Sequence, residues 1–222
     1  NLERFAVLLF LSTVIATYGV LGDSTATVIG AMIIAPLMTP IMATAAGLVM
    51  GDMKRAGQAF LTVVLGVVAV IAVAWVIGIL HLGVISFTTN SQITARVSPS
   101  LIDLAVALAS GAAGAFAFSR LDVADSLPGV AISIALVPPL AVVGLSLSAA
   151  QWGDALGALL LFLTNFVSIL LTGGGVFALL GLGAAATKEL VGPARRKAFI
   201  YGALGALIVA IPLAATSIQV AR

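Results

Sequence analysis

Two apolar segments of this chain carry prolines at places where a membrane-spanning helix would be continuous. They are GAMIIAPLMTPIM at 30–42 and GVAISIALVPPLAVVG at 129–144, one in each half of the sequence. In bilayer hydrocarbon an unpaired backbone carbonyl costs several kcal/mol, so helix-breaking prolines are tolerated there where a cavity, water or a neighbouring helix satisfies the freed groups. Broken helices in matching halves are typical of membrane transport sites.

Composition places the chain in the membrane. Hydrophobic residues make up 62% and charged residues 8% of the sequence, and the mean hydropathy is +1.26, which excludes an ordinary water-soluble domain. Taking about 20 apolar residues per crossing, the sequence predicts an all-α, polytopic bundle in a single transmembrane domain over 1–222. The expected spans number seven and lie near 4–21, 27–50, 57–80, 101–118, 127–150, 155–180 and 198–215. The chain enters the first at once, and no small-residue cleavage site follows it, so we read it as a span rather than a signal peptide.

The basic residues predict the orientation, because Lys and Arg are enriched on the cytoplasmic side. With seven spans, eight fall on one side, namely Arg4, Lys54, Arg55, Arg120, Lys188, Arg195, Arg196 and Lys197, against Arg96 and Arg222 on the other. This asymmetry favours a cytoplasmic amino terminus in a prokaryotic cell (inner) membrane. If the proline-broken segments were re-entrant hairpins, the count would fall to six against four.

The two halves, about 4–80 and 101–180, share an order of features. Each has a span, an Asp-Ser pair, a broken helix with Ile-Ala and Pro, a Gly-Asp pair and another span; the matched positions are Asp23 with Asp125, Ile34-Ala35 with Ile134-Ala135, Pro40 with Pro139, and Gly51-Asp52 with Gly153-Asp154. Since three crossings are an odd number, the second copy would be inserted upside down. The sequence thus predicts a 3+3 inverted repeat with broken second and fifth helices, plus an extra span. The alternative is that Ala-rich and Gly-rich spans resemble one another by composition alone.

Three stretches carry a family resemblance: GAMIIAPLMTPI, ITARVSPSLIDLAVALASGAAGA at Ile93–Ala115, and LPGVAISIALVPPLAVVG at Leu127–Gly144. They resemble a widespread prokaryotic family of hydrophobic membrane proteins known as a domain of unknown function. The resemblance covers almost the whole chain and implies a polytopic membrane domain, to which family members often add a soluble amino-terminal region. It implies no activity.

The candidate pathway follows from the prolines. A proline cannot donate to the carbonyl four residues earlier, so Pro36 and Pro40 would free the carbonyls of Met32 and Pro36, and the second pair would act likewise. Polar side chains nearby complete the set of predicted pathway residues, which are Met32, Pro36, Thr39, Pro40, Ser133, Ile134, Ala135, Pro138, Pro139 and Asn165. The alternatives are packing kinks and, for Asn165 with Thr164 and Ser168, hydrogen bonds that join helices.

Four charged residues are candidates for the mouths or a gate: Asp23, Arg96, Asp103 and Asp125. The segments Asp23-Ser24-Thr25 and Asp125-Ser126, each just before a broken helix, would serve as N-caps or would attract cations at the two mouths. Arg96 and Asp103 flank Pro99 and would form an external ion pair or an outer gate. Asp52 and Asp154 each follow a glycine and are interpreted as turn residues.

Absent chemistry narrows the function. The chain has no cysteine and one histidine, His81, so we expect no disulfide, no metal site and no cofactor. We expect no catalytic residues and no enzyme, because a GxGD pattern is missing and His81 lies at a span end. Basic residues do not cluster with aromatics, which excludes nucleic acid as a partner. The sequence therefore favours a channel or secondary transporter for a small ion or solute, embedded in lipid and assembled as a homo-oligomer through its glycines. A membrane scaffold or sensor serving a soluble region outside this chain is the alternative.

Overall fold

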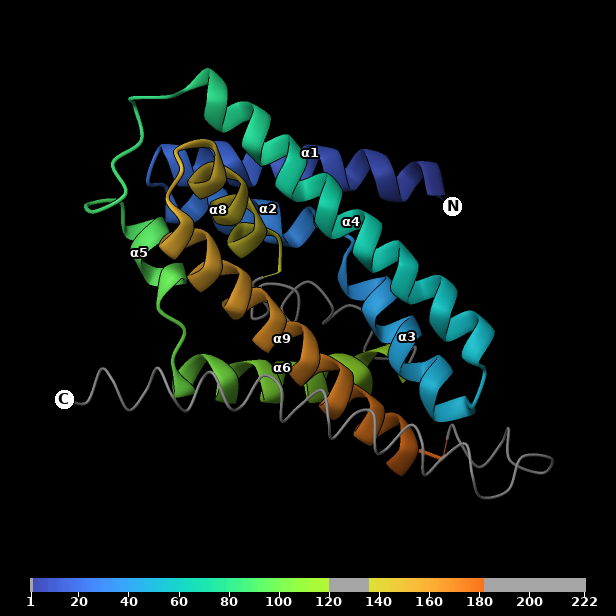
Figure 1. Cartoon of the computed structure of the whole chain (residues 1–222). Coiled ribbons are helices and arrows are strands. Elements are labelled where there is room, and N and C mark those ends of the chain that lie inside the picture. The colour runs from blue at the N-terminus through green and yellow to red at the C-terminus, as the bar shows by residue number, and fades with distance from the viewer. Residues whose placement is uncertain (1, 120–135, 182–222) are drawn as a thin grey trace. The chain divides into compact units, whose positions relative to one another are not determined.

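The computed structural model describes residues 2–119 and 136–181, and these residues form helices and no strands (Figure 1). The helices are α1 (Leu2–Leu21), α2 (Thr25–Ile34), α3 (Met38–Met50), α4 (Met53–Leu80), α5 (Ser91–Val97), α6 (Leu101–Ser119), α8 (Val137–Ser148) and α9 (Trp152–Leu179). The all-α fold class is confirmed. The predicted seventh span at 198–215 lies outside the described residues, so the count of seven stays a prediction.

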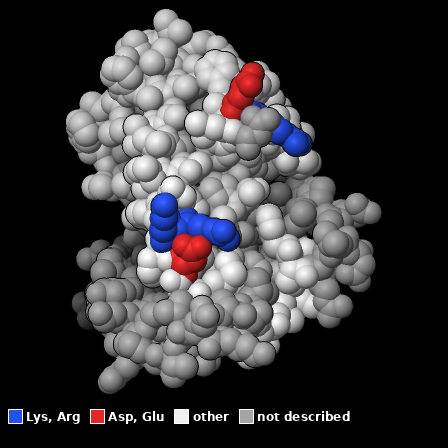
Figure 2. Space-filling model, turned by 90° about the vertical axis from the view of Figure 1, so that its right-hand side faces the viewer, with Lys and Arg blue, Asp and Glu red and all other residues white. Residues whose placement is uncertain are grey.

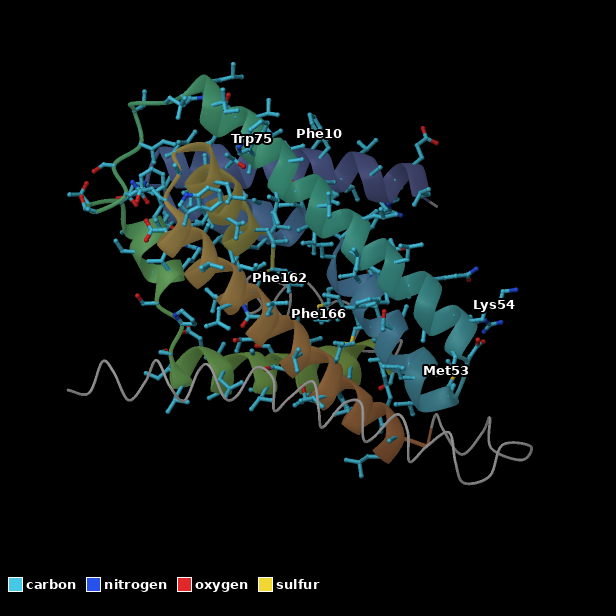
Figure 3. The ribbon with its side chains drawn as sticks, viewed as in Figure 1. Phe10, Met53, Lys54, Trp75, Phe162 and Phe166 are labelled. Carbon is cyan, nitrogen blue, oxygen red and sulfur yellow. The ribbon has the colours of Figure 1, made fainter. Side chains whose placement is uncertain are left out.

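Four of these helices, α1, α4, α6 and α9, are long and apolar enough to cross a membrane. The pair α2 and α3 adds a fifth crossing if it is taken as one span bent by 48°. Large apolar side chains point outward: Phe10 on α1 is 54% exposed and Trp75 on α4 is 44% exposed (Figure 3). On the face drawn in Figure 2, the described residues show two small groups of charged side chains and are otherwise uncharged. These are the surfaces of an integral membrane protein.

The described residues divide into two compact units, each with its own packing. Unit 1 holds α1, α2, α5, α8, residues 64–80 of α4 and residues 152–163 of α9. Unit 2 holds α6, residues 39–50 of α3, residues 53–63 of α4 and residues 164–179 of α9. Both units therefore take part of each of the two longest helices.

Helix α8 forms the centre of unit 1. Its residues are buried without interruption from Val137 to Ser146, so it has no polar face of its own. It packs against α1 and α2, and Gly144 lets it approach α4 closely. A Cβ placed on Gly144 would lie 2.6 Å from both the carbonyl oxygen of Ile71 and the Cβ of Ala74, which only a residue without a side chain avoids.

Unit 2 packs through small residues in the same way. A Cβ on Gly111 of α6 would lie 2.8 Å from the Cα of Ile169 on α9. One turn later on α9, Gly173 faces the sulfur of Met42 on α3. The rings of Phe60 and Phe166 lie 6.1 Å apart, centroid to centroid, and join α4 to α9 within this unit.

The two halves of the chain share one register. The first residues of α1, α3 and α4 are Leu2, Met38 and Met53, and the residues 99 positions later, Leu101, Val137 and Trp152, begin α6, α8 and α9. Helices α4 and α9 also have the same length of 28 residues. Two of the matched pairs lie in opposite units: α1 in unit 1 corresponds to α6 in unit 2, and α3, apart from Met38, in unit 2 to α8 in unit 1. Helices α4 and α9 are each divided between the two units.

Hydrogen bonds confirm this register at the turns before the two long helices. The amide of Asp52 donates to the carbonyl of Gly47 at 2.9 Å, and 99 residues later the amide of Gln151 donates to Ser146 at 2.8 Å. The predicted match of Gly51-Asp52 with Gly153-Asp154 differs from this register by three residues. Asp52 caps α4, accepting from the amide of Arg55 at 3.0 Å, whereas Asp154 lies inside the first turn of α9, where the helix dipole favours a carboxylate.

Candidate functional site

The first helix break lies at Pro36. Helix α2 ends at Ile34, and Ala35 is extended with φ −63° and ψ 124°, the conformation that a following proline favours. The amide of Ala35 still donates to the carbonyl of Ala31 at 3.1 Å. Pro36 has no amide hydrogen to offer Met32, so the chain leaves the helix here and restarts at Met38 with the 48° bend.

Pro40 does not break a helix, which corrects its predicted role. It is the third residue of α3, and amides in the first turn have no intrahelical acceptor, so a proline there removes no hydrogen bond. Its carbonyl accepts from the hydroxyl of Thr44 at 2.8 Å. Thr39 lies beside it in the same turn. Of the two prolines, Pro36 alone accounts for the discontinuity.

The second proline pair begins a helix within the described residues. Pro138 and Pro139 stand in the first turn of α8, after an N-cap residue, Leu136, that makes no side-chain capping bond. Both prolines are buried. The remaining predicted members of this break, Ser133, Ile134 and Ala135, lie outside the described residues, as does Asp125 at the predicted mouth.

Helices α2 and α8 are both too short to cross a bilayer alone. With 10 and 12 residues, they measure about 15 and 18 Å at 1.5 Å per residue, against about 30 Å of hydrocarbon. They pack against each other in unit 1, where Met32, near the end of α2, contacts the same core as Val142 and Val143 of α8. The side chain of Met32 is thus part of the core.

A polar cluster joins α5 to the turn between α1 and α2; its members are Asp23, Thr25, Asn90, Ser91, Gln92 and Arg96. One carboxylate oxygen of Asp23 accepts from the hydroxyl of Ser91 at 2.6 Å and from the amide of Gln92 at 3.1 Å. The side chain of Asn90 donates to the carbonyl of Val20, in the last turn of α1, at 2.7 Å. These bonds link residues about 70 positions apart in the chain and hold α5 in place. We call this group of six residues the α5 cluster.

Gln92 is the centre of the α5 cluster. It is buried, at 5% exposure, and its side-chain nitrogen donates to the hydroxyl of Thr25 at 2.8 Å. Its carbonyl and its side-chain oxygen both accept from Nη1 of Arg96, the latter at 3.2 Å. Gln92 therefore connects the aspartate of one turn to the arginine of another.

Electrostatics differ at the two charged ends of the cluster. The hydrogen bond from Ser91 is the main reason that the pKa of Asp23 lies below its ordinary value, and partial desolvation opposes the effect. Burial lowers the pKa of Arg96. Asp23 also has a positive φ of 49°, a conformation that Asp tolerates better than most residues.

One predicted role at this end is confirmed and another needs correction. The cap of α2 predicted within Asp23-Ser24-Thr25 is Ser24, whose hydroxyl accepts from the amide of Thr27 at 3.4 Å, while Asp23 holds α5. Arg96 and Asp103 do not form the predicted ion pair: Arg96 bonds to Gln92, and Asp103 accepts from the amide and the hydroxyl of Ser100 at 2.8 and 2.6 Å. Ser100 and Asp103 thereby form the cap of α6.

Sequence reasoning missed Asn90, Ser91 and Gln92, which make most of the bonds of the α5 cluster. The signal was an Asn before a short run of helix-compatible residues, because Asn is a preferred N-cap. The side chain of Asn90 indeed accepts from the amide of Ile93 at 3.0 Å.

Asn165 lies in unit 2, inside α9 and 5% exposed, with Thr164 and Ser168 also buried. Their burial fits either of the predicted roles, helix joining or solute contact, and the contact of Asn165 with a solute stays a prediction. Across the described ranges, His, Asp and Glu do not gather in any group of three that could hold a metal ion.

The long apolar helices, the bent pair and the short buried helix define the class: an all-α integral membrane protein with discontinuous helices. Residues 32–171 match the family described as Domain of unknown function (DUF389). Since the match covers more than half of the chain, the protein belongs to this family.

A relative of the chain is the uncharacterized protein MJ0678 of Methanocaldococcus jannaschii. It is 34% identical over 176 residues, which are 79% of this chain and 54% of the relative. The chain thus spans about half the length of the relative. No solved structure matches the chain.

Proposed function

We propose that the protein is a channel or secondary transporter for a small ion or solute, built as a 3+3 inverted repeat. The observation that carries the proposal is the common register of the halves, in which one helix is broken at Pro36 and its counterpart region restarts at Pro138 and Pro139. Transporters place their solute sites where helices of such repeats are discontinuous.

Inversion is supported by the number of crossings. If α2 and α3 form one bent span, the first half crosses the membrane three times, through α1, α2 with α3, and α4. An odd number of crossings reverses the direction in which the second half enters. A two-fold axis in the membrane plane would then exchange the halves, and α1 with α6, like α3 with α8, are found in opposite units.

Packing between the halves agrees with the same symmetry. In unit 1, α8 of the second half packs on α4 of the first half at Ala74. In unit 2, α3 of the first half packs on α9 of the second half at Gly173, which is 99 residues after Ala74. Each short helix thus packs on the long helix of the other half.

The predicted pathway residues are retained with one change of emphasis. We assign the first break to Pro36 and the carbonyl of Met32, with Thr39 in the turn that follows. Pro40 lies in the same turn, where a proline removes no hydrogen bond, so its ring is given no role in the pathway. The second break involves Pro138 and Pro139, together with the candidates Ser133, Ile134 and Ala135. Asn165 is the polar side chain proposed to assist.

The test is flux through the purified protein in proteoliposomes, screened with small cations, anions and neutral solutes. We expect at least one solute to move faster than in empty vesicles. Pro36→Ala restores an amide donor for Met32 and should straighten the bend, so flux should fall by at least about tenfold, as a misplacement of site groups by about 1 Å would cause.

Pro40→Ala is the matched control, because a first-turn amide gains no partner. Its flux should equal that of the unmodified protein. If both variants transport normally, the break is a packing feature. If no solute moves in any vesicle, the protein is not a channel or transporter, and the scaffold or sensor alternative takes its place.

A further inference from the structure

Arg96 is a partly buried charge for which the described residues supply no counter-ion. It lies in the last turn of α5, and the ion pair found in the described part of the chain joins Arg55 to Asp52. Nη1 of Arg96 bonds to Gln92, but its Nε is buried and has no partner. A desolvated guanidinium without a carboxylate or a full set of acceptors is destabilising, so an anionic group bound at Arg96 would offset the cost that the described residues leave.

The carboxylates of unit 1 do not fill this role. Asp23 is engaged by Ser91 and Gln92. Glu3 stands at the opposite end of the 20-residue helix α1, about 30 Å along its axis. Asp154, in the first turn of α9, makes no ion pair with Arg96. The donor capacity of Arg96 is therefore available to a ligand.

A second buried polar group without a partner lies in α8, which also belongs to unit 1. The hydroxyl of Ser146 is fully buried in α8 and makes no hydrogen bond. The turn that follows does not need this hydroxyl, because the matching turn of the first half is built on Gly47 with the same backbone bond. Ser146 thus carries a donor that the local fold leaves unused.

The helices that carry the two groups pack together: α5 contacts α8, and both contribute to a hydrophobic cluster that includes a residue of α9. Ile93, one turn before Arg96, shares a hydrophobic cluster with Leu145, the neighbour of Ser146, and with Ala158 of α9. The missing side chain of Gly157 lets α9 approach the carbonyl of Val97, the residue after Arg96.

We propose that this junction binds an oxyanion group, a carboxylate or a phosphate, with Arg96 as the principal ligand and Ser146 as a second donor. A planar guanidinium matches two anionic oxygens, which a cation or a neutral solute does not offer. Gln92 is a positioning residue, since it fixes one nitrogen of Arg96. The inference rests on the proposed function where it identifies the transported solute as an oxyanion. The binding of an oxyanion at this junction can be tested without measuring flux.

The experiment measures binding of inorganic phosphate and of acetate to the whole purified protein in phospholipid-free detergent, by titration calorimetry at constant ionic strength. We expect saturable binding that Arg96→Gln weakens by at least about tenfold, the loss expected for a charge-assisted hydrogen bond. Arg96→Lys keeps the charge without the fork and should give an intermediate affinity. Arg55→Gln, which removes an exposed and already paired arginine, should bind as the unmodified protein does.

Ser146→Gly installs the residue that the first half has at this position, so the turn should remain while affinity falls severalfold. A second arm compares thermal unfolding in nanodiscs of zwitterionic lipid with discs containing phosphatidylglycerol. Stabilisation by the anionic lipid that depends on Arg96 identifies a headgroup as the source of the oxyanion, and binding of phosphate or acetate in detergent identifies a dissolved ion.

Two results overturn the inference: Arg96→Gln and Arg96→Lys behaving like the unmodified protein in both arms, or the unmodified protein responding in neither. If the protein binds an oxyanion through Arg96 but moves no solute, the binding site stands and the proposed transport fails. If the protein moves a solute but shows no binding that depends on Arg96, the proposed transport stands and the binding site fails.

Discussion

Gly51 and Ala150 occupy the same left-handed backbone position in two turns that lie 99 residues apart, with φ of 75° and 56°. Each ends a short helix, and the amide of the next residue bonds back to Gly47 or Ser146. Glycine adopts this conformation freely, whereas the Cβ of alanine meets the following carbonyl oxygen. The fold therefore imposes the same left-handed backbone conformation on both residues, although only Gly51 is well suited to it.

Ala150→Gly should raise the thermal unfolding midpoint, and Gly51→Ala should lower it. The left-handed conformation costs a non-glycine residue about 1–2 kcal/mol, and part of this gain is lost because glycine is more disordered in the unfolded chain. Circular dichroism of the detergent-solubilised protein measures both midpoints. A higher midpoint for Ala150→Gly and a lower midpoint for Gly51→Ala would support the equivalence of the two turns. A lower midpoint for both variants would contradict it.

Much of the fold could be predicted from the sequence, because spans follow from apolar length alone. Helices α1, α4, α6 and α9 lie close to the predicted spans at 4–21, 57–80, 101–118 and 155–180. The existence of a break in the second span was also predicted. Its position was not, because Pro36 and Pro40 look alike in sequence, while only a proline beyond the first helical turn removes a hydrogen bond.

The register and the α5 cluster could not be predicted for a different reason. The two Gly-Asp pairs suggested a match three residues away from the one that the helices adopt, since a shared dipeptide says nothing about which backbone bonds form. Asp23 was interpreted together with its neighbour Ser24, but its partners Ser91 and Gln92 come 68 and 69 residues later in the chain. Contacts between residues so distant in sequence leave no local pattern.

Gly144→Ala should destabilise unit 1. The added Cβ would lie 2.8 Å from the backbone nitrogen of Trp75 as well as close to Ala74 and Ile71, and backbone atoms cannot move aside as a flexible side chain can. Overpacking of this kind costs about 1–3 kcal/mol. Loss of thermal stability, followed by the unfolding midpoint in detergent, is the measure.

Gly175→Ala is the matched control for that variant. Gly175 lies within α9, and a Cβ there would meet nothing within 4 Å, so the change should stabilise the protein by about 1 kcal/mol through helix propensity. If Gly144→Ala and Gly175→Ala had the same unfolding midpoint, the close approach of α8 to α4 at Gly144 would be contradicted.

Asp23→Asn should remove a pH-dependent part of the stability. The pKa of Asp23 lies below its ordinary value of 3.8, mainly through the hydrogen bond from Ser91, so the carboxylate stabilises the fold above pH 3.8 and loses this effect as the pH falls through the lowered pKa. Asn keeps the oxygen acceptor and tolerates the positive φ. The difference between the two unfolding midpoints should be largest near pH 6 and vanish at low pH.

The other acidic groups titrate in both proteins, so the difference isolates Asp23. A difference that stays constant from pH 6 to pH 3 would mean that the charge of Asp23 does not hold α5. Hydrogen exchange of 90–97, measured at one pH near neutrality, should be faster in Asp23→Asn, because the amide of Gln92 then donates to a weaker acceptor.

Lys54 and Gly153 stand at equivalent positions in the two halves, 99 residues apart near the starts of α4 and α9. If the repeat is inverted, these positions face opposite sides of the membrane, with Lys54 in the cytoplasm. The chain has no cysteine, so Lys54→Cys and Gly153→Cys can each be labelled as a single thiol in intact cells. Both sites are exposed, and a side chain at Gly153 would meet nothing within 4 Å.

A membrane-impermeant maleimide should therefore label Gly153→Cys from outside and reach Lys54→Cys only after the membrane is opened. Thr88→Cys, in the exposed loop after α4, provides the internal control, because α4 is a single continuous helix of 28 residues whose two ends must lie on opposite sides if it spans the bilayer. Labelling of Thr88→Cys from outside with Lys54→Cys protected would establish the orientation of α4. If Gly153→Cys were then protected like Lys54→Cys, the halves would be parallel, and both the in-plane two-fold axis and the transport pathway built on it would be lost.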